Sequence, residues 1–241
     1  MVYFILAAGT GSRLHPITLK HPKTLFSLDS QTTILKRMVS LIQKLDPQGK
    51  IVVICGFQHR LLQENVSGVT WICNPFYKVT NSIASLWFAR EFLNGEVTIL
   101  NGDIVMSEQL LREVVTVSTP RPVVLVDSSV TNGDYNVQAD EDQVIVMSKQ
   151  LSSYTGEYAG VTKLDPASTA LLRDQIDEMV DDGRYTTWYE DALVQMIFEH
   201  NFRLFTCDIS RYEWTEVDSV DDFMFAKKIH EKENRASSQS E

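Results

Sequence analysis

Short apolar runs bounded by turn residues recur through the first half of the 241-residue chain. Each run is rich in β-branched residues and is too short to form a helix. Such continuous runs are typical of strands buried on both faces, as in a parallel sheet. The predicted strands are Val2–Ala7 and residues 51–55, 69–73, 97–100 and 123–126.

Segments with helical spacing lie between these runs. Apolar residues recur at i, i+3, i+4 and i+7 over Ile34–Leu45, and a second apolar face covers residues 83–92 behind Asn81 and Ser82, which are candidate helix caps. The alternation of strand and helix predicts an α/β fold. We expect a doubly wound, mostly parallel but mixed sheet with helices on both faces, and a ligand crevice at the carboxyl ends of its strands.

The second half of the chain is less regular and predicts the antiparallel part of a mixed sheet. Asn132-Gly133 is a tight-turn signal between residues 123–126 and 135–138, and residues 143–147 alternate as in a hairpin or an edge strand. We expect a single domain over residues 1–235, fraying from Lys232 onward and a flexible tail over 236–241. Further strands are expected at 158–164, 202–208 and 212–218, and further helices at 107–117, 167–180, 188–200 and after 218.

The charge balance argues against a polyanionic partner. The chain has 22 Lys plus Arg against 32 Asp plus Glu, a formal net charge of −10, so we expect neither nucleic-acid nor membrane binding. No apolar run approaches the ~20 residues that span a bilayer. Cys55, Cys73 and Cys207 lack metal-ligand spacing, which favours reduced thiols and a cytoplasmic location. The sequence makes no prediction of the oligomeric state.

The segment after the first predicted strand carries the candidate chemistry. Small residues around Gly9 and Gly11 let a base or a phosphate approach the backbone without meeting a Cβ atom. Arg13 and Lys23 follow and bring two cations to one anionic ligand. The segment lacks the third glycine of a dinucleotide fingerprint and the Gly-Lys-Ser/Thr ending of a Walker A loop. It therefore predicts a polyphosphate-binding loop of another kind.

The pattern Leu6-Ala-Ala-Gly-x-Gly-x-Arg-Leu, followed by Pro16 and Pro22-Lys23, resembles the signature of the superfamily of sugar-phosphate and phosphocholine nucleotidyltransferases. The resemblance implies a Rossmann-like nucleotidyltransferase fold. It also implies that Arg13 binds the β- and γ-phosphates of a nucleotide and that Lys23 binds the α-phosphate that is attacked. The nucleotide-binding residues that it implies are Leu6, Ala7, Ala8, Gly9, Thr10, Gly11, Asn81 and Ser82.

Nucleotidyl transfer needs charge neutralisation more than a strong base, because the attacking phosphate is already an anion near neutral pH. Mg²⁺ provides it and prefers carboxylate and phosphate oxygens. Asp103 follows a buried predicted strand within Asn101-Gly-Asp, where the family usually has Asp-Gly-Asp, and Trp214-Thr-Glu-Val-Asp218 resembles the segment that holds a second metal carboxylate. The resemblance thus implies Mg²⁺ ligands at Asp103 and Asp218; helix capping is the alternative for each.

Two clusters combine aromatic rings with carboxylates, one at 188–191 and one at 212–216. Such clusters attract a quaternary or a primary ammonium through cation–π and Coulomb interactions, and core packing at a helix start is the alternative. Lys149 resembles the lysine that holds the acceptor phosphate in sugar-type members. The candidate acceptor-binding residues are Lys149, Glu157, Trp188, Tyr189, Glu190, Tyr212, Trp214 and Glu216.

Residues 80–85, Thr-Asn-Ser-Ile-Ala-Ser, resemble the Asn-rich helix entry of cytidylyltransferases, and this resemblance favours CTP. Our first hypothesis is a Mg²⁺-dependent cytidylyltransferase that transfers CMP from CTP to a small phosphorylated amine, phosphocholine in the first place, and releases pyrophosphate. One alternative is a sugar-1-phosphate nucleotidyltransferase that uses UTP or dTTP. The other is a nucleotide-binding module without turnover.

Overall fold

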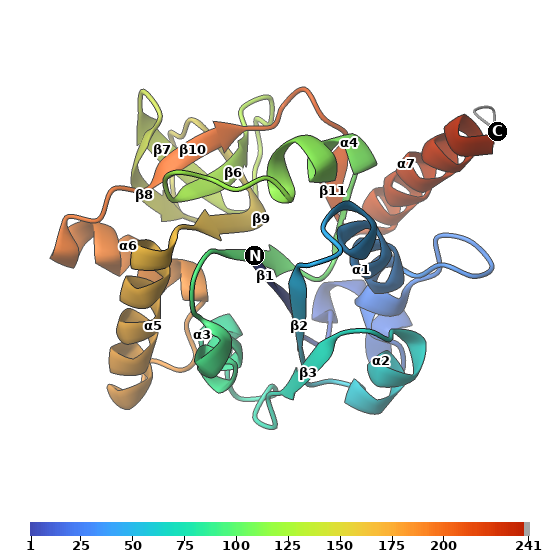
Figure 1. Cartoon of the computed structure of the whole chain (residues 1–241), viewed down its shortest axis with the longest axis horizontal. Coiled ribbons are helices and arrows are strands. Elements are labelled where there is room, and N and C mark those ends of the chain that lie inside the picture. Colours follow the sequence, from blue (N-terminus) through green and yellow to red (C-terminus); the bar gives the residue numbers. More distant parts are fainter. Residues whose placement is uncertain (239–241) are drawn as a thin grey trace.

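The computed structural model describes residues 1–238 and shows a long sheet covered by helices (Figure 1). The strands are β1 (Val2–Ala7), β2 (Lys50–Cys55), β3 (Thr70–Cys73), β4 (Val97–Asn101), β5 (Ile104–Met106), β6 (Val123–Asp127), β7 (Asn136–Asp140), β8 (Gln143–Ser148), β9 (Gly156–Leu164), β10 (Phe205–Asp208) and β11 (Trp214–Glu216). The helices are α1 (Ile34–Leu45), α2 (His59–Asn65), α3 (Ser82–Phe88), α4 (Glu108–Leu110), α5 (Pro166–Asp181), α6 (Tyr189–His200) and α7 (Val220–Ser238). Short 3-10 helices lie at Ser12–Leu14, Ile17–Leu19, Lys23–Leu25 and Arg90–Phe92, and a π-helix follows α4 at Leu111–Val115.

The first half of the sheet is parallel, in the order β3-β2-β1-β4. All five strands predicted from apolar runs are present, and each agrees with the prediction to within one residue at either end. Strands β1, β2, β4 and β6 are buried at nearly every position, so their sequences are continuously apolar and do not alternate, whereas β3 at the edge of the sheet is only partly buried. Because β3, β2, β1 and β4 run parallel, their carboxyl ends meet at one edge of the sheet, where a doubly wound sheet places its ligands.

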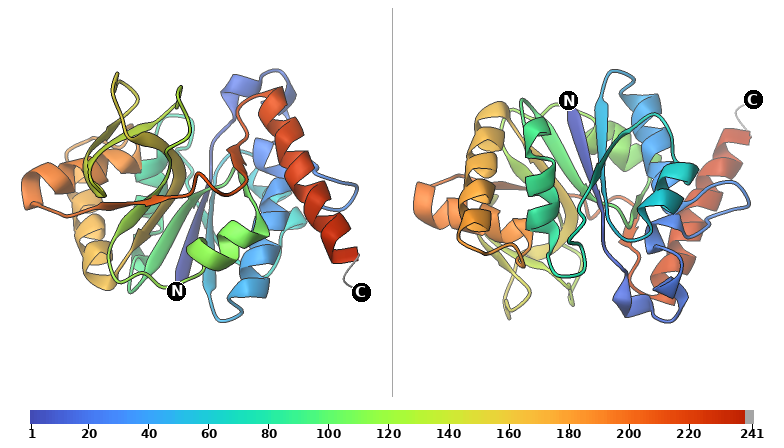
Figure 2. Two further views of the ribbon diagram at one scale, coloured as in Figure 1. Left: turned by 90° about the horizontal axis from the view of Figure 1, so that it is seen from above. Right: turned by 90° about the horizontal axis from the view of Figure 1, so that it is seen from below.

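Helices cover both faces of the sheet, as predicted (Figure 2). On one face Met38 of α1 and Leu110 of α4 belong to a single apolar core with the strands. On the other face Leu86 of α3, Ile176 of α5 and Met196 of α6 form a second core. The sheet is thus the middle of three layers, and its strand ends are held rigidly from both sides.

The second half of the sheet is mostly antiparallel, as expected for the mixed part, but it closes on itself, which the sequence did not predict. Strands β9-β6-β10-β8-β7 follow one another, and β7 pairs again with β9, so five strands close into a small barrel. The closure depends on β9, which pairs with β4 at its end and with β7 at its start. Between Val124 and Val126 of β6 the partner on β9 shifts from Thr162 to Tyr158, an irregularity that contains Gly160 at φ +69°. Such bulges bend a strand and allow a sheet to curl.

One local prediction also differs from the structure. The turn at Asn132-Gly133 does not join paired strands, because β6 pairs with β9 and β10. The hairpin lies one step further along, between β7 and β8, where Glu141 adopts a positive φ of 52° in the turn. The short elements α2 and β5 were not predicted, since neither has enough residues to establish a period.

The last helix, α7, crosses the loop that follows β1. Ala226 and Ile229 of α7 form a third apolar cluster with Leu14, Leu28 and Val217. The helix continues through Lys232, where fraying was expected, to Ser238. Residues 239–241 of the predicted tail lie outside the described residues.

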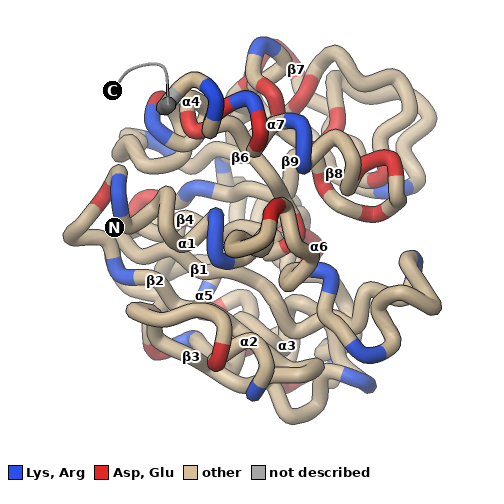
Figure 3. The backbone as a smooth tube through the Cα atoms, turned by 90° about the vertical axis from the view of Figure 1, so that its right-hand side faces the viewer, with Lys and Arg blue, Asp and Glu red and all other residues tan. Residues whose placement is uncertain are grey.

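The distribution of charged residues and the hydropathy of the helices concern the predictions about nucleic-acid and membrane binding. Basic and acidic residues are interspersed along the side of the chain that Figure 3 faces. Within residues 1–238, none of the helices combines the length and the hydropathy that a bilayer crossing requires.

Gly160 offers a test of the bend in β9. A Cβ atom there would lie 2.6 Å from Ile104 Cδ1 and 2.8 Å from Asn101 Nδ2, whereas at Gly95, with a similar φ of 74°, it would meet nothing within 4 Å. Both Gly→Ala variants carry the cost of a left-handed alanine, about 1–2 kcal/mol, and Gly160→Ala adds overpacking of about 1–3 kcal/mol. We expect urea unfolding to show the larger loss of unfolding free energy for Gly160→Ala. Equal losses would contradict this account of the bend.

Candidate active site

A cavity of about 370 Å³ opens at the carboxyl ends of the parallel strands and extends toward the barrel. Its walls come from the loop after β1, the end of β4, the start of α3, the strands β8, β9 and β11 and the segments beside them. Sixteen of the twenty site residues predicted from the sequence line this cavity. They are Leu6, Ala7, Ala8, Gly9, Thr10, Gly11, Arg13, Lys23, Asn81, Ser82, Asp103, Lys149, Trp188, Glu190, Glu216 and Asp218.

The loop after β1 is folded so that its backbone faces the cavity. Gly11 adopts φ +64°, and its carbonyl accepts a hydrogen bond from Thr18 Oγ1 at 2.6 Å. A Cβ atom on Gly9 would meet no protein atom within 4 Å, so the backbone there is open to a ligand. The turn after β4 can approach the end of β1 because it contains Gly102. A Cβ atom at this position would lie 2.7 Å from the Leu6 carbonyl oxygen.

Three carboxylates converge at one wall of the cavity. Asp103 lies in the turn between β4 and β5, while Glu216 ends β11 and Asp218 follows it. Antiparallel pairing of β11 with β5 sets Glu216 opposite Ile104, and the Val217 amide donates to the Asp103 carbonyl at 3.0 Å. One oxygen from each of Asp103, Glu216 and Asp218 lies within 4.8 Å of the others. Residues more than 100 positions apart are thereby brought to one point.

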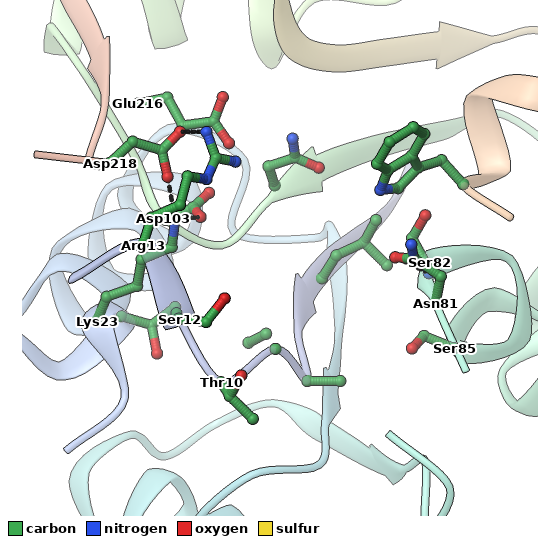
Figure 4. A pocket seen from close by; sticks show the side chains of 18 of the residues that line it. Thr10, Ser12, Arg13, Lys23, Asn81, Ser82, Ser85, Asp103, Glu216 and Asp218 are labelled. Carbon is green, nitrogen blue, oxygen red and sulfur yellow. Dashed lines mark hydrogen bonds and ion pairs between the residues drawn. The ribbon is translucent and has the colours of Figure 1, made fainter. Parts of the chain in front are cut away.

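Two cations meet these carboxylates (Figure 4). Lys23 Nζ lies 2.5 Å from Asp103 Oδ2 and 2.7 Å from Asp218 Oδ1. Arg13 Nη1 lies 2.7 Å from Asp218 Oδ2 and 3.0 Å from Asp134 Oδ2. Burial opposes the charged form of Lys23, but the neighbouring carboxylates outweigh burial and raise its pKa above the ordinary value. The ammonium therefore stays protonated at neutral pH.

The carboxylate wall has the chemistry of a divalent-cation site. Burial, with the nearby Asp103 and Asp218 charges, raises the pKa of Glu216 well above its ordinary value. Asp103 Oδ1 is buried without a hydrogen-bond partner in the described part of the chain. An excess of buried carboxylate oxygens, one of them unpaired, suits a hard cation with oxygen ligands. Glu216, which the sequence placed in the acceptor pocket, lies with the two aspartates instead.

The opposite wall carries polar groups from the start of α3. Figure 4 shows Asn81, Ser82 and Ser85 across the cavity from the charged cluster. Asn81 caps α3, its Oδ1 accepting from the Ser82 amide at 2.8 Å. Ser82 Oγ accepts from the Tyr189 amide at 2.9 Å, which ties the start of α6 to this wall.

An aromatic and acidic cluster lies beside this wall. The Trp188 ring lies edge to face with Tyr135 at 6.2 Å, and Tyr135 lies edge to face with Tyr158 at 6.0 Å. Glu190 is 7% exposed, and burial, with Asp191 adding to the effect, raises its pKa to about 8. Lys149 Nζ lies 4.8 Å from the centre of the Trp188 ring. The cluster joins aromatic faces to a buried carboxyl group.

A line of charges joins this cluster to the carboxylate wall. Asp134 accepts from Arg13 at 3.0 Å and from Lys149 at 2.8 Å. Burial opposes the charged form of Asp134, but Lys149 and Arg13 lower its pKa. Two cations that the sequence assigned to phosphates are thus held by one carboxylate.

Four predicted acceptor residues lie outside the cavity lining, which corrects their assignment. Tyr189 is fully buried and its hydroxyl bonds to Tyr158 at 2.5 Å, because the residue after Trp188 points into the core rather than into the cavity. The other three are each held by a different partner: Tyr212 donates to Glu113, Trp214 donates to Asp127, and Glu157 accepts from the Asp134 amide.

Several lining residues were missed by the sequence reasoning. Asn74 follows β3 directly, so the rule that ligands gather at carboxyl strand ends, applied to this strand too, would have found it. Tyr135 and Asp134 follow the Asn132-Gly133 turn, and Tyr158 lies in β9. No local pattern marks these three, because the closure of the barrel is what turns them toward the cavity.

The fold places two basic side chains beside a cluster of carboxylates in one cavity at the carboxyl ends of the parallel strands. The chain belongs to the family of the MobA-like NTP transferase domain, whose model matches residues 3–177. The resemblance to nucleotidyltransferases is confirmed.

Three relatives have related names. The chain is 27% identical to the choline-phosphate cytidylyltransferase of Streptococcus pneumoniae, over 97% of this chain and all of that protein. It is 25% identical to the 2-aminoethylphosphonate cytidylyltransferase of Lancefieldella rimae, over 90% of this chain and 87% of that protein. It is 27% identical to the CMP-5'-(3-aminopropyl)phosphonate synthase of Streptomyces rubellomurinus, over 90% of this chain, but spans only 37% of that protein's length.

Solved structures agree on the fold. A structure of the CTP:phosphocholine cytidylyltransferase from Streptococcus pneumoniae matches with a TM-score of 0.75 at 23% identity, over 95% of this chain and 98% of that one. The inositol-1-phosphate CTP transferase from T. maritima matches with a TM-score of 0.73 at 17% identity, over 95% of both chains.

The position of Lys23 between two carboxylates makes it a test of the carboxylate wall. We expect Lys23→Met to lower the unfolding free energy by about 3 kcal/mol at pH 8, because it leaves the mostly buried Asp103 carboxylate without its counterion, while Asp218 keeps its contact with Arg13. The loss shrinks toward pH 5, since such carboxylates take up protons as the pH falls. Lys44→Met, at a lysine 61% exposed in its pair with Glu108, is the control and costs less than about 1 kcal/mol. Urea unfolding at both pH values checks this, and a loss independent of pH contradicts it.

Proposed function

We propose that the protein is a Mg²⁺-dependent cytidylyltransferase that transfers CMP from CTP to a small amine bearing a phosphate or a phosphonate. An acceptor oxygen forms a bond to the α-phosphorus of CTP, and the bond from that phosphorus to the oxygen bridging to the β-phosphate breaks. The electron pair of the broken bond leaves with pyrophosphate. The product is a CMP-linked phosphoryl or phosphonyl amine.

One observation carries the proposal: a single cavity is lined by side chains suited to a polyphosphate and by side chains suited to an ammonium group. Lys23, Arg13 and the three carboxylates form the first. Trp188 and Glu190 belong to the second, and Lys149 lies between the two through Asp134. A substrate with an anionic phosphorus group and a cationic nitrogen a few bonds away would contact both.

The choice of CTP is supported by sequence and by relatives. The Asn81-Ser82 entry of α3, which resembles that of cytidylyltransferases, lines the cavity together with Asn74 and Ser85. These are amide and hydroxyl groups, which suit hydrogen bonding to the edge of a base. The relatives from Streptococcus pneumoniae and Lancefieldella rimae are both named cytidylyltransferases.

The chain's own residues account for the main steps. Asp103, Glu216 and Asp218 would hold Mg²⁺, which when bound would neutralise charge on the triphosphate. Lys23 and Arg13 donate hydrogen bonds to phosphate oxygens and stabilise the negative charge that builds on the α-phosphate and on the leaving pyrophosphate. Lys23 is held protonated by its neighbours, so it enters the reaction as a cation. No strong base is required, because the acceptor oxygen is already anionic.

Pyrophosphate release tests the reaction. The purified protein is incubated with CTP, UTP or dTTP against phosphorylated amines, aminoalkylphosphonates and glucose 1-phosphate, with and without Mg²⁺. We expect pyrophosphate only from CTP with an amine-bearing acceptor and Mg²⁺. Turnover of UTP or dTTP with glucose 1-phosphate would establish the sugar alternative, and nucleotide binding without any turnover would establish a binding module.

Asp103 tests the part played by the carboxylate wall. Asp103→Asn keeps the size of the side chain but removes a charge, so we expect kcat to fall by about 10²-fold or more while the fold persists. Asp142→Asn, at an exposed aspartate paired with Arg121 in the turn between β7 and β8, is the matched control. Steady-state kinetics and thermal unfolding check both variants. An unchanged kcat in Asp103→Asn would remove this residue from the mechanism.

A further inference from the structure

We infer that the aromatic and acidic cluster selects a primary ammonium over a quaternary ammonium in the acceptor, so that Glu190 and Tyr135 are specificity-determining residues. The inference rests on the proposed function and narrows its substrate class. The sequence favoured phosphocholine, which carries a trimethylammonium group. The structure supplies this cluster with hydrogen-bond acceptors that such a group cannot use.

Two oxygens carry the inference. Glu190 Oε2 and the Tyr135 hydroxyl oxygen are both buried and have no hydrogen-bond partner among the residues that the structure describes. Both side chains line the cavity. Buried polar atoms nearly always have hydrogen-bond partners in folded proteins. Two such atoms without partners in one cavity therefore indicate a ligand that forms hydrogen bonds with them.

The two groups belong to one cluster, since the Tyr135 ring packs against Trp188, two residues before Glu190. The charge of Glu190 raises the pKa of Tyr135, after the larger effect of burial. Tyr158, the next ring in the cluster, has no such free group, since its hydroxyl is bonded to Tyr189 and to Thr162 within the core. Glu190 and Tyr135 are therefore the free acceptors at this place.

A primary ammonium matches these acceptors and a quaternary one does not. A primary ammonium has three N–H donors, so it has a donor to offer both to Glu190 Oε2 and to the Tyr135 oxygen. A trimethylammonium has no donor and would leave both oxygens desolvated and unpaired, which is the costly arrangement. Sites built to hydrogen-bond a substrate discriminate strongly against analogues that lack the donor.

The aromatic surface points the same way. A quaternary ammonium is recognised chiefly by open ring faces. Here Lys149 Nζ already lies 4.8 Å from the centre of the Trp188 ring. Tyr135 meets both Trp188 and Tyr158 edge to face. The rings are engaged with one another and with a protein cation, whereas the carboxyl and hydroxyl oxygens are free.

The experiment compares two acceptors that differ only in three N-methyl groups, O-phosphoethanolamine and phosphocholine, each with CTP and Mg²⁺. We expect kcat/KM to be about tenfold or more higher for O-phosphoethanolamine. In Glu190→Gln and in Tyr135→Phe we expect this ratio to fall toward one through a rise in KM for O-phosphoethanolamine. The KM for CTP should change little, because the triphosphate contacts are elsewhere.

Glu199→Gln on the exposed end of α6 and Tyr185→Phe at an exposed ring are the matched controls and should keep the wild-type ratio. If Glu190→Gln does not fold, Tyr135→Phe alone decides. Equal or better use of phosphocholine by the wild type overturns the inference and leaves cytidylyl transfer standing. An unchanged ratio in the folded variants also overturns it. Absence of pyrophosphate with every acceptor refutes the proposed function itself.

Discussion

The position of the Lys23 ammonium between Asp103 and Asp218 is the contact on which the site depends. It joins residues 195 positions apart, one from the loop after the first strand and one from the segment after the last. All three side chains are mostly buried, with 14–18% of their surface exposed, so each charge needs a partner close by, and Asp218 also contacts Arg13. Without the cation, the pairing of β11 with β5 would press carboxylates together at a strand end. The arrangement that stabilises the folded chain is therefore the one to which the proposed function assigns the phosphate and metal charges.

Much of the parallel half could be predicted from the sequence, because burial on both faces leaves a local signature. A strand such as β1 is apolar at nearly every position, and this pattern does not depend on what it pairs with. The barrel could not be predicted in the same way. Its closure depends on which residues of β9 pair with β6 and which with β7, and on the bend at Gly160. Those are long-range choices of register, and a tight-turn signal such as Asn132-Gly133 does not determine them.

The residues of the candidate site also fall into those that local sequence predicts and those that depend on long-range strand pairing. Residues next to one another in a motif were placed well, because the loop from Gly9 to Lys23 is a local structure. Adjacency misled where it crossed a helix start: Trp188 faces the cavity, while Tyr189 is buried in the core. Tyr135 could not be predicted as a site residue for a different reason, since it is the closure of the barrel that brings it to the cavity. Convergence of Glu216 with the aspartates likewise depends on strand pairing and not on spacing in the sequence.

The two halves of the fold carry different parts of the proposed chemistry. The parallel half supplies the loop after β1 and Asp103, which contact the nucleotide side of the proposed reaction. The barrel and the segments around it supply Tyr135, Lys149 and Tyr158, which face the acceptor side. On the proposed function, the side chains that would recognise the acceptor are thus separate from the loop after β1. The three relatives are all named for cytidylyl or CMP chemistry, and their names differ in the amine. The physical reason is that attack at the α-phosphorus makes the same demand whichever acceptor is bound, whereas in the proposed site a few side chains would recognise the nitrogen end by packing and hydrogen bonds.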